Sequence, residues 1–254
     1  ATAPKKLLAG APHNLERRAT REMALFAVVR LARTAPSERF SDFAAAPSPY
    51  LEGVFDPLML KNPKTAWVGL WETNRGCPFS CAYCDWGAVS EKKVHPRPIE
   101  TLFKEIDWFS KNKIEFVFCC DANFGILTRD IDIVRYLAEN KRKYGYPQAL
   151  SVQCTKNFTE HAYEIYKTLS EAGLSKGVSL SLQSMNAQTL RDTKRKNIPI
   201  KTFEEIQRKL ASFKIETFTD LILGLPNETY ESFADGVASV IKNGQHSRIQ
   251  FNNR

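Results

Sequence analysis

Residues 74–87 read NRGCPFSCAYCDWG and place three thiols, Cys77, Cys81 and Cys84, at C-x3-C-x2-C spacing. On an α-helix these three positions would share one face, so a stripe of buried cysteines is one interpretation. Pro78 argues against it, because a proline inside a helix costs about 3 kcal/mol. We therefore expect a loop, and a loop that gathers three thiols is typical of a metal site.

The ligand chemistry of this loop favours an iron–sulfur cluster over zinc. Zinc sites typically combine C-x2-C pairs with a fourth Cys or His. Here one spacing is three residues, and the nearest histidine, His95, lies in a basic segment next to proline. Cys thiolates hold iron–sulfur clusters, normally four for a cubane cluster, so three would leave one iron open to a small molecule. Zinc and free thiols are the alternatives.

The composition indicates a globular chain, with 254 residues of which 43% are hydrophobic and 25% charged. That length is enough for one sizeable core, and the absence of an apolar run near 18 residues excludes a membrane helix. The net charge is +8, but without a basic stripe interleaved with aromatic residues we expect no nucleic-acid binding. Six cysteines, three of them in one loop, favour a reducing, cytoplasmic setting over a secreted disulfide scaffold.

The chain divides into three regions. Residues 1–45 hold eight Lys or Arg and four Asp or Glu, which makes them a basic, Ala/Arg-rich extension. Three interpretations of this extension are open: a short packing helix, a poorly ordered segment, or an organelle transit peptide. Residues 46–64 form a linker punctuated by Pro and Gly. Residues 65–254 form the core domain.

The core alternates strands and helices. Strands are expected at 66–73, 114–120, 149–153, 177–184, 216–223 and 248–251. Helices are expected at 98–111, 130–143, 159–171, 187–194, 202–213 and 230–242. Such alternation gives a parallel α/β sheet, which right-handed crossovers curl into a barrel. Because the chain stops after the sixth strand, we expect a partial (β/α)6 TIM-like barrel that lacks its last helix.

Chemistry-bearing residues fall at the carboxyl ends of these strands, where the active sites of such folds lie. The cysteine loop follows the first strand. Asp121 and Asn123 follow the second, and Gln153, Gln183 and Gly224 follow later strands. This common position predicts one site at one end of the barrel.

Together these segments resemble the radical S-adenosylmethionine (radical SAM) superfamily, in its cobalamin-associated branch. The loop matches the family's C-x3-C-x-aromatic-C signature, with Tyr83 as the aromatic residue. The supporting segments are PSPYL at 47–51, DANFG at 121–125, SLQS at 181–184, KRKN at 194–197 and DLILGLPNET at 220–229. The resemblance runs from about Ala46 to the end of the chain.

The resemblance implies that Cys77, Cys81 and Cys84 ligate three irons of a [4Fe-4S] cluster and that S-adenosylmethionine chelates the fourth. It implies a radical SAM enzyme that cleaves S-adenosylmethionine to a 5′-deoxyadenosyl radical. The radical would serve hydrogen abstraction or methyl transfer on an unknown small-molecule substrate. A ferredoxin or flavodoxin would supply the electron, no membrane is involved, and no catalytic residue is assigned beyond the cluster.

The resemblance also assigns cofactor contacts on the first half of the barrel. Tyr83 would flank the adenine through its backbone, or would only pack. Asp121 and Asn123 take the place of the family's Gly-Gly-Glu motif, and their polar side chains suit the methionyl ammonium. An Asx turn that caps the strand is the alternative for this pair.

The remaining contacts come from later strands. Gln183, and with a weaker signal Gln153, would lie near the ribose or the methionyl carboxylate. Ile222 and Gly224 would lie along the adenine, although a tight turn also explains the glycine. Cys154 is expected as a buried free thiol, with a fourth ligand or a catalytic thiol as alternatives.

Cobalamin use is the least defined of these implications. The branch usually carries an N-terminal cobalamin domain with an Asp-x-His-x-x-Gly motif, and no Asp stands two residues before any of the four histidines. The residues before the linker are also shorter than a domain. We therefore expect that domain to be absent here, while cobalamin itself stays open. The competing interpretation is a truncated, non-catalytic iron–sulfur protein whose cluster is structural or carries electrons.

Overall fold

The computed structural model describes residues 42–86, 92–155 and 158–253. The expectations for the extension at 1–41 lie outside the described residues. No helix among the described residues is long and apolar enough to span a membrane.

Six parallel strands form the core as two three-stranded sheets. The first sheet has the order β1-β4-β5, with β1 (Val68–Trp71), β4 (Phe116–Cys119) and β5 (Ala149–Ser151). The second has the order β6-β7-β8, with β6 (Val178–Ser179), β7 (Thr217–Leu223) and β8 (Arg248–Asn253). The prediction of a partial, parallel α/β barrel is confirmed, and the described strands do not close into a full barrel.

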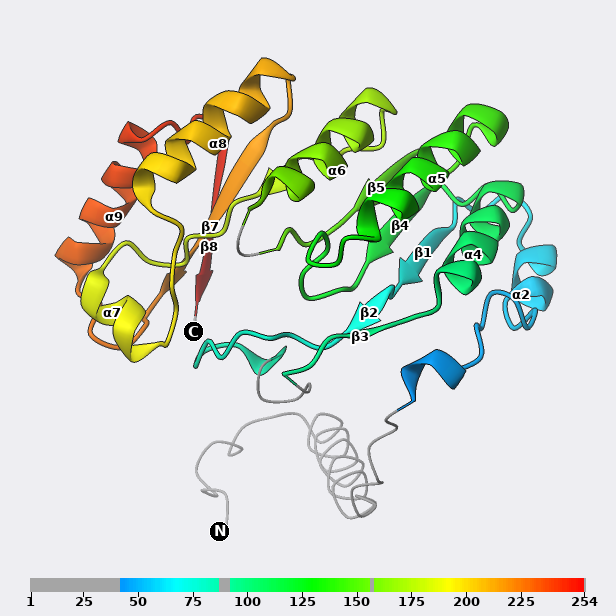
Figure 1. The fold of residues 1–254 in the computed structure, drawn as a ribbon, viewed down its shortest axis with the longest axis horizontal. Helices are drawn as coiled ribbons and strands as arrows, with labels where there is room; N and C mark the ends of the chain where they lie inside the picture. Colours follow the sequence, from blue (N-terminus) through cyan, green and yellow to red (C-terminus); the bar gives the residue numbers. More distant parts are fainter. Residues whose placement is uncertain (1–41, 87–91, 156–157, 254) are drawn as a thin grey trace, which may run out of the picture. The chain divides into compact units, whose positions relative to one another are not determined.

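Helices alternate with the strands and form an outer arc, with the strands on its inner side (Figure 1). They are α4 (Ile99–Lys111), α5 (Asp130–Tyr144), α6 (Glu160–Glu171), α7 (Ala187–Asp192), α8 (Ile200–Ser212) and α9 (Tyr230–Lys242). Local signals set several of their starts. Thr159 caps α6 by accepting from the Ala162 amide, and Thr229 forms a capping box with Ser232 at α9.

The strand faces differ in burial because only one of them is covered by helices. Val117 and Cys119 of β4 are fully buried, and Gly69 of β1 packs so closely on α4 that an added Cβ would lie 3.2 Å from Phe109. On the opposite face of β1, Leu70 is 65% exposed. The apolar core therefore lies between the helices and the sheets, and the inner side of the arc is open.

Three local features differ from the sequence-based expectation. A short antiparallel ladder joins β2 (Asn74–Arg75) to β3 (His95–Pro96), on either side of the cysteine loop. The expected strand at 177–184 is regular only over β6; beyond it Gln183 has a left-handed backbone conformation with φ of 68° and forms an isolated bridge with Leu221. The segment expected as a linker contains the helix α2 (Asp56–Lys61).

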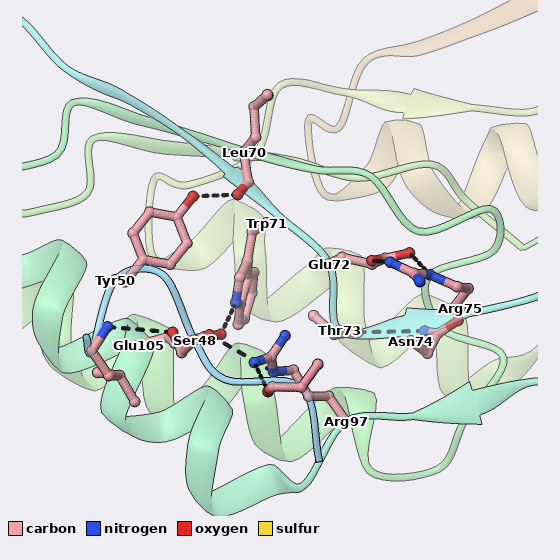
Figure 2. Close-up of polar contacts among 12 residues, drawn as sticks. Ser48, Tyr50, Leu70, Trp71, Glu72, Thr73, Asn74, Arg75, Arg97 and Glu105 are labelled. Atoms are coloured by element: carbon pink, nitrogen blue, oxygen red, sulfur yellow. Dashed lines mark hydrogen bonds and ion pairs between the residues drawn. The ribbon is translucent and has the colours of Figure 1, made fainter. Parts of the chain in front are cut away.

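Tyr50, in that same segment, is part of the core. Its ring packs against Phe55, Trp108 and Phe109, with the closest centroids 4.8 Å apart. Its hydroxyl donates to the Leu70 carbonyl of β1 (Figure 2). The contact fixes the middle of β1, the strand that leads into the cysteine loop.

A buried cluster of three side chains, Trp71, Arg97 and Glu105, fixes the end of β1. The indole nitrogen of Trp71 donates to Glu105 Oε2 at 2.7 Å, and Arg97 Nε lies 3.8 Å from Glu105 Oε1 (Figure 2). Arg97 Nη2 donates to the Ala46 carbonyl at 2.8 Å. Because all three side chains are at least nine-tenths buried, these contacts are shielded from water and hold β1, α4 and residue 46 together.

Candidate iron–sulfur and nucleoside site

The three cysteines lie in an irregular loop after β2, as predicted, and none of them is in a helix. Gly76 precedes the first cysteine with φ of 111°, a conformation that favours glycine. Cys77 is buried, while Cys81 and Cys84 are half-buried and are joined by a turn in which the Cys84 amide donates to the Cys81 carbonyl at 3.1 Å.

Asp121, at the end of β4, holds the start of this loop. One carboxylate oxygen accepts from the amides of Thr73 and Asn74 at 2.7 and 3.2 Å. The other accepts from the Thr73 hydroxyl and, at 2.7 Å, from Asn74 Nδ2. Burial raises the pKa of Asp121 to about 6, against the opposing effect of these hydrogen bonds. The structure therefore gives Asp121 a loop-holding role that the sequence did not indicate.

Asn123 contacts the motif directly. Its Nδ2 lies 3.2 Å from Cys77 Sγ, and both residues are buried. The backbone around it is fixed by a parallel bridge between Phe124 and Cys154, in which the Phe124 amide donates to the Gln153 carbonyl at 2.8 Å. The loop after β4 is thus joined both to the cysteine motif and to the next strand.

The other side of the loop meets the second half of the barrel. The Ala82 amide donates to the Thr193 carbonyl at 2.8 Å, and Arg195 Nη1 donates to the Tyr83 hydroxyl at 3.0 Å. Burial raises the pKa of Tyr83 well above its usual value, so the phenol is protonated at neutral pH. The Tyr83 side chain therefore has a specific polar partner and is more than a packing residue.

A cavity of about 520 Å³ opens beside the loop at the carboxyl ends of the strands. Five of the predicted site residues line it: Cys84, Asp121, Asn123, Gln153 and Gln183. Cys77, Cys81, Tyr83, Ile222 and Gly224 do not contribute to the lining. The size is ordinary for a small-molecule site, and its position is the one that the strand-end argument predicted.

Gln183 occupies a constrained place in this cavity. Its backbone amide donates to the Asp220 carbonyl at 2.7 Å, and its carbonyl accepts from the Ile222 amide at 2.8 Å. Its side-chain Oε1 is buried and has no hydrogen-bond partner among the described residues. Buried polar atoms are normally paired, so this oxygen is one of several exceptions among the described residues, while Gln183 as a residue lines the cavity.

Ile222 and Gly224 lie on β7 and just after it. Ile222 is half-buried and is held beside Gln183 by the amide contact given above. Gly224 is exposed with φ of 87°, a conformation that favours glycine. The tight turn therefore accounts for the glycine by itself.

Several polar lining residues were missed by the sequence interpretation. Ser179, Ser181 and Arg195 line the cavity, and the two serine hydroxyls donate to Asp220 Oδ2, with 2.9 Å for Ser179. The alternation of Ser179, Ser181 and Gln183 along one strand direction was a usable signal, because residues two apart share a face. Arg195 lies in the KRKN segment that carries the family resemblance, but no site role was assigned to it there.

Two of the three remaining thiols, Cys119 and Cys154, lie in surroundings that disfavour the thiolate. Cys119 is fully buried, and burial raises its pKa well above the usual value. Burial also raises the pKa of Cys154 to about 12, so that its thiol is protonated at neutral pH. Neither environment favours a thiolate ligand, and Cys154 is not supported as a fourth ligand.

The donor set fits a cluster better than a single metal ion. Among the described residues, no three His, Cys, Asp or Glu side chains form a group that could hold one metal ion. Zinc needs its ligands around one point, whereas each cysteine of a cubane cluster binds a different iron. Three thiols in one loop, beside a cavity lined by polar strand-end residues, fit a cluster with a small polar ligand.

Comparison with protein families gives the class of protein. Residues 71–238 match the family model described as the Radical SAM superfamily. This match spans well over half of the chain and includes the cysteine loop and the four strands β4, β5, β6 and β7. The chain therefore belongs to the Radical SAM superfamily, whose members are enzymes that use a [4Fe-4S] cluster and S-adenosylmethionine.

Two curated relatives show which members of the superfamily this chain is similar to in sequence. The chain is 42% identical over 217 residues to 2-(S-pantetheinyl)-carbapenam-3-carboxylate methyltransferase of Streptantibioticus cattleyicolor, covering 85% of this chain and 32% of that protein. It is 39% identical over 216 residues to the cobalamin-dependent radical SAM methyltransferase TokK of Streptomyces tokunonensis, covering 84% of this chain and 32% of that protein. The chain thus spans about a third of the length of these relatives.

The solved structures support the fold. The radical S-adenosylmethionine methyltransferase TsrM from Kitasatospora setae, with tryptophan and a SAM analogue bound, matches with a TM-score of 0.62 at 18% identity. The match covers 76% of this chain and 37% of TsrM. Coproporphyrinogen III oxidase from Escherichia coli matches with a TM-score of 0.57 at 17% identity, covering 89% of this chain and 52% of that one.

Proposed function

We propose that this chain is the core of a radical SAM methyltransferase that acts on a small molecule. The observation that carries the proposal is the placement of the three-cysteine loop beside a 520 Å³ cavity lined by strand-end polar groups. Methyl transfer is preferred over other radical chemistry because both curated relatives above are named methyltransferases.

In the proposal, Cys77, Cys81 and Cys84 hold the [4Fe-4S] cluster. When bound, the reduced cluster supplies the electron that cleaves S-adenosylmethionine to methionine and a 5′-deoxyadenosyl radical. Asn123 keeps Cys77 in place through its Nδ2 contact, and Asp121 fixes the start of the loop. The chain thereby limits the freedom of the loop before any ligand arrives, which lowers the entropic cost of binding.

The cavity provides the polar groups for S-adenosylmethionine. The amides of Gln153 and Gln183 carry both donors and acceptors, which suit ribose hydroxyls and the methionyl carboxylate. The hydroxyls of Ser179 and Ser181 also line the cavity, and the Asp220 carboxylate behind them accepts from both and holds them in place. Ile222, half-buried on β7, would lie along the adenine.

We further propose that cobalamin takes part in the methyl transfer, since TokK is described as cobalamin-dependent. A one-electron donor such as a ferredoxin or flavodoxin would reduce the cluster, and a reducing compartment would keep the thiols available. None of the six cysteines forms a disulfide in the described part of the chain, as such a setting requires.

The test is anaerobic reconstitution of the full chain with iron and sulfide. We expect about four irons per chain, 5′-deoxyadenosine after reduction with S-adenosylmethionine, and S-adenosylhomocysteine as a further product when cobalamin and a methyl acceptor are present. Cys77→Ala, Cys81→Ala and Cys84→Ala should each abolish S-adenosylmethionine cleavage. Cys119→Ala, which removes a thiol from the core, serves as the matched control and should retain the iron.

The outcomes separate the competing functions. A cluster that forms but shows no calorimetric binding of S-adenosylmethionine would indicate a non-catalytic iron–sulfur protein. Zinc without iron or sulfide after anaerobic purification would indicate a zinc site. Release of 5′-deoxyadenosine by all three motif variants would exclude the proposal.

A further inference from the structure

The cysteine loop begins and ends at a short ladder, and all three motif cysteines lie between its two strands. β2 and β3 pair there over only two residues each. Thr73 precedes β2, Arg97 follows β3, and the Arg97 amide donates to the Thr73 carbonyl at 2.9 Å (Figure 2). We call the ladder together with these two residues the neck of the loop. Because a two-stranded hairpin is by itself marginally stable in water, the neck needs further contacts to stay closed.

Arg129, the residue before α5, binds both sides of the neck. Its Nη2 donates to the Thr73 carbonyl at 2.8 Å, and its Nη1 donates to the Arg97 carbonyl. Thr73 and Arg97 are both at least nine-tenths buried, so water competes little for these carbonyls. Because the guanidinium is planar and charged, it holds its two donors in a fixed arrangement and forms strong hydrogen bonds with both acceptors.

The backbone beside Arg129 is itself fixed. Asp130, the first residue of α5, is fully buried, and its Oδ2 accepts from the amides of Gly125 and Leu127 at 2.8 and 3.1 Å. These contacts tie the start of α5 to the loop after β4, the same loop that carries Asn123. The guanidinium therefore extends from a rigid helix end, next to the loop that contacts the first motif cysteine.

Arg129 and Asp121 hold the cysteine loop in different ways. Asp121 binds Thr73 and Asn74, which both lie where the chain enters the loop. Arg129 also binds Arg97, which lies where the chain leaves it. Loss of the Asp121 carboxylate would loosen one strand, whereas loss of the guanidinium would let the two strands separate. Separation of its ends gives a loop more conformational freedom, which opposes any ligand that must gather groups along it.

We propose that Arg129 is a positioning residue that closes the neck of the cysteine loop and so keeps the three thiols together for a cluster. Arg129 is not among the residues that line the cavity, and it acts on the thiols through the backbone of the loop. This inference rests on the proposed function for its effect on a cluster, but closure of the neck is testable without any cofactor.

The first test uses the cofactor-free chain and measures hydrogen exchange of single amides by nuclear magnetic resonance. We expect Arg129→Met to speed exchange of the Arg97 amide by about tenfold, because the neck then opens while the core stays folded. The Val117 amide, in the middle strand of the first sheet, should exchange at the wild-type rate. Arg129→Lys should give an intermediate rate, since an ammonium group lacks the planar pair of donors.

Arg135→Met is the matched control for both tests. Arg135 lies on the same helix, but its side chain is 61% exposed and pairs with Asp132 of α5. The control removes an arginine without touching the neck, so exchange of the Arg97 amide should stay at the wild-type rate.

The second test uses the chain reconstituted with iron and sulfide, and measures the rate at which a chelator removes the iron. We expect Arg129→Met to lose iron several-fold faster than the wild type, Arg135→Met to lose it at the wild-type rate, and Arg129→Lys to fall between them. A general loss of stability would not give this pattern alone, because it would also speed exchange of the Val117 amide.

The results have distinct meanings. Arg97 exchange in Arg129→Met equal to that in Arg135→Met would overturn the inference, as would equal acceleration of the Arg97 and Val117 amides. Faster Arg97 exchange with unchanged iron release would overturn it too, since the neck would then not keep the thiols together. If Arg129→Met does not fold, Arg129→Lys decides from the same two amides. If the wild type takes up no iron, the proposed function fails, and Arg97 exchange still decides whether Arg129 closes the neck.

Discussion

Asn123 Nδ2 lies 3.2 Å from Cys77 Sγ, so the residue two places after Asp121 donates toward the first cysteine of the motif. Cys77 is 8% exposed and Asn123 is 5% exposed, which shields the contact from water. Hydrogen bonds to cysteine sulfurs are among the factors that set the reduction potential of iron–sulfur clusters. The contact therefore links the loop after β4 to the electronic properties of the proposed cluster.

Replacement of Asn123 should lower the reduction potential of that cluster. Asn123→Ala removes an N–H donor that stabilises the reduced, more negative state, and Asn123→Asp places a negative charge beside the sulfur and should lower it further. A redox titration followed by electron paramagnetic resonance measures the effect. Asn112→Ala, at an exposed helix end, is the control, and equal potentials in all four proteins would contradict the assigned contact.

Asp121→Asn should destabilise the start of the cysteine loop by roughly 1–3 kcal/mol. The carboxylate accepts four hydrogen bonds from Thr73 and Asn74, and the amide group of an asparagine would turn two donor hydrogens toward these donors. Denaturant unfolding of the cofactor-free chain measures the loss. Asp132→Asn is the control because Asp132 is largely exposed on α5, and an equal loss in both variants would exclude the specific role of Asp121.

The raised pKa of Asp121, about 6, predicts a pH dependence of stability. Between the unfolded value near 3.8 and about 6, the folded chain holds a proton that the unfolded chain has released. The contribution of Asp121 to the free energy of unfolding therefore falls as pH rises through this window, by up to about 1.4 kcal/mol per pH unit. Subtracting the pH profile of Asp121→Asn from that of the wild type isolates the effect, and a difference that stays flat from pH 4 to 6 would contradict it.

Tyr50 should behave as a core residue despite its place in a Pro-rich segment. Tyr50→Phe loses the hydrogen bond to Leu70 and should cost about 1 kcal/mol of unfolding free energy. Tyr50→Ala also loses the packing on Phe55, Trp108 and Phe109, and should cost about 3–5 kcal/mol. Thermal unfolding of both variants checks this order, and losses below 0.5 kcal/mol in both would show that residues 46–64 act as a mere linker.

Replacement of Gln183 by glycine should stabilise the fold but weaken ligand binding. Gln183→Gly relieves a left-handed backbone conformation and should raise the free energy of unfolding by about 1 kcal/mol. The same change removes the side-chain amide from the cavity and should weaken S-adenosylmethionine binding by roughly 2–10-fold, the value of one hydrogen bond. Thermal unfolding measures the stability of the variant, and calorimetric titration measures its affinity for S-adenosylmethionine. Gln183→Ala is the control, because it loses the amide group but keeps the strained backbone conformation. Unchanged affinity in both variants would show that Gln183 does not contribute to the binding site.

Much of the architecture could be predicted because its signals are local. The apolar runs around β1, β4 and β7 and the periodic helices between them identified the parallel core, and right-handed crossovers predicted that it curls into a partial barrel. The backbone after β6 could not be predicted in this way, because its only described pairing, Gln183 with Leu221, joins residues 38 positions apart in the sequence. The burial of Tyr50 was hidden for the same reason, since its partners lie on α4 and β1.

By itself the sequence determined the pattern on which the proposed chemistry rests: three cysteines at a defined spacing, at the end of a strand, in a chain whose other strands also end in polar residues. Only the tertiary structure decided which polar residues hold the loop and which line the cavity. Asp121 binds Thr73 and Asn74, while Arg195 binds Tyr83 from more than a hundred residues away. The physical reason is that ligand spacing is a local property of the chain, whereas the partner of a buried polar group is chosen by the packing of distant elements, which brings donors and acceptors within about 3 Å.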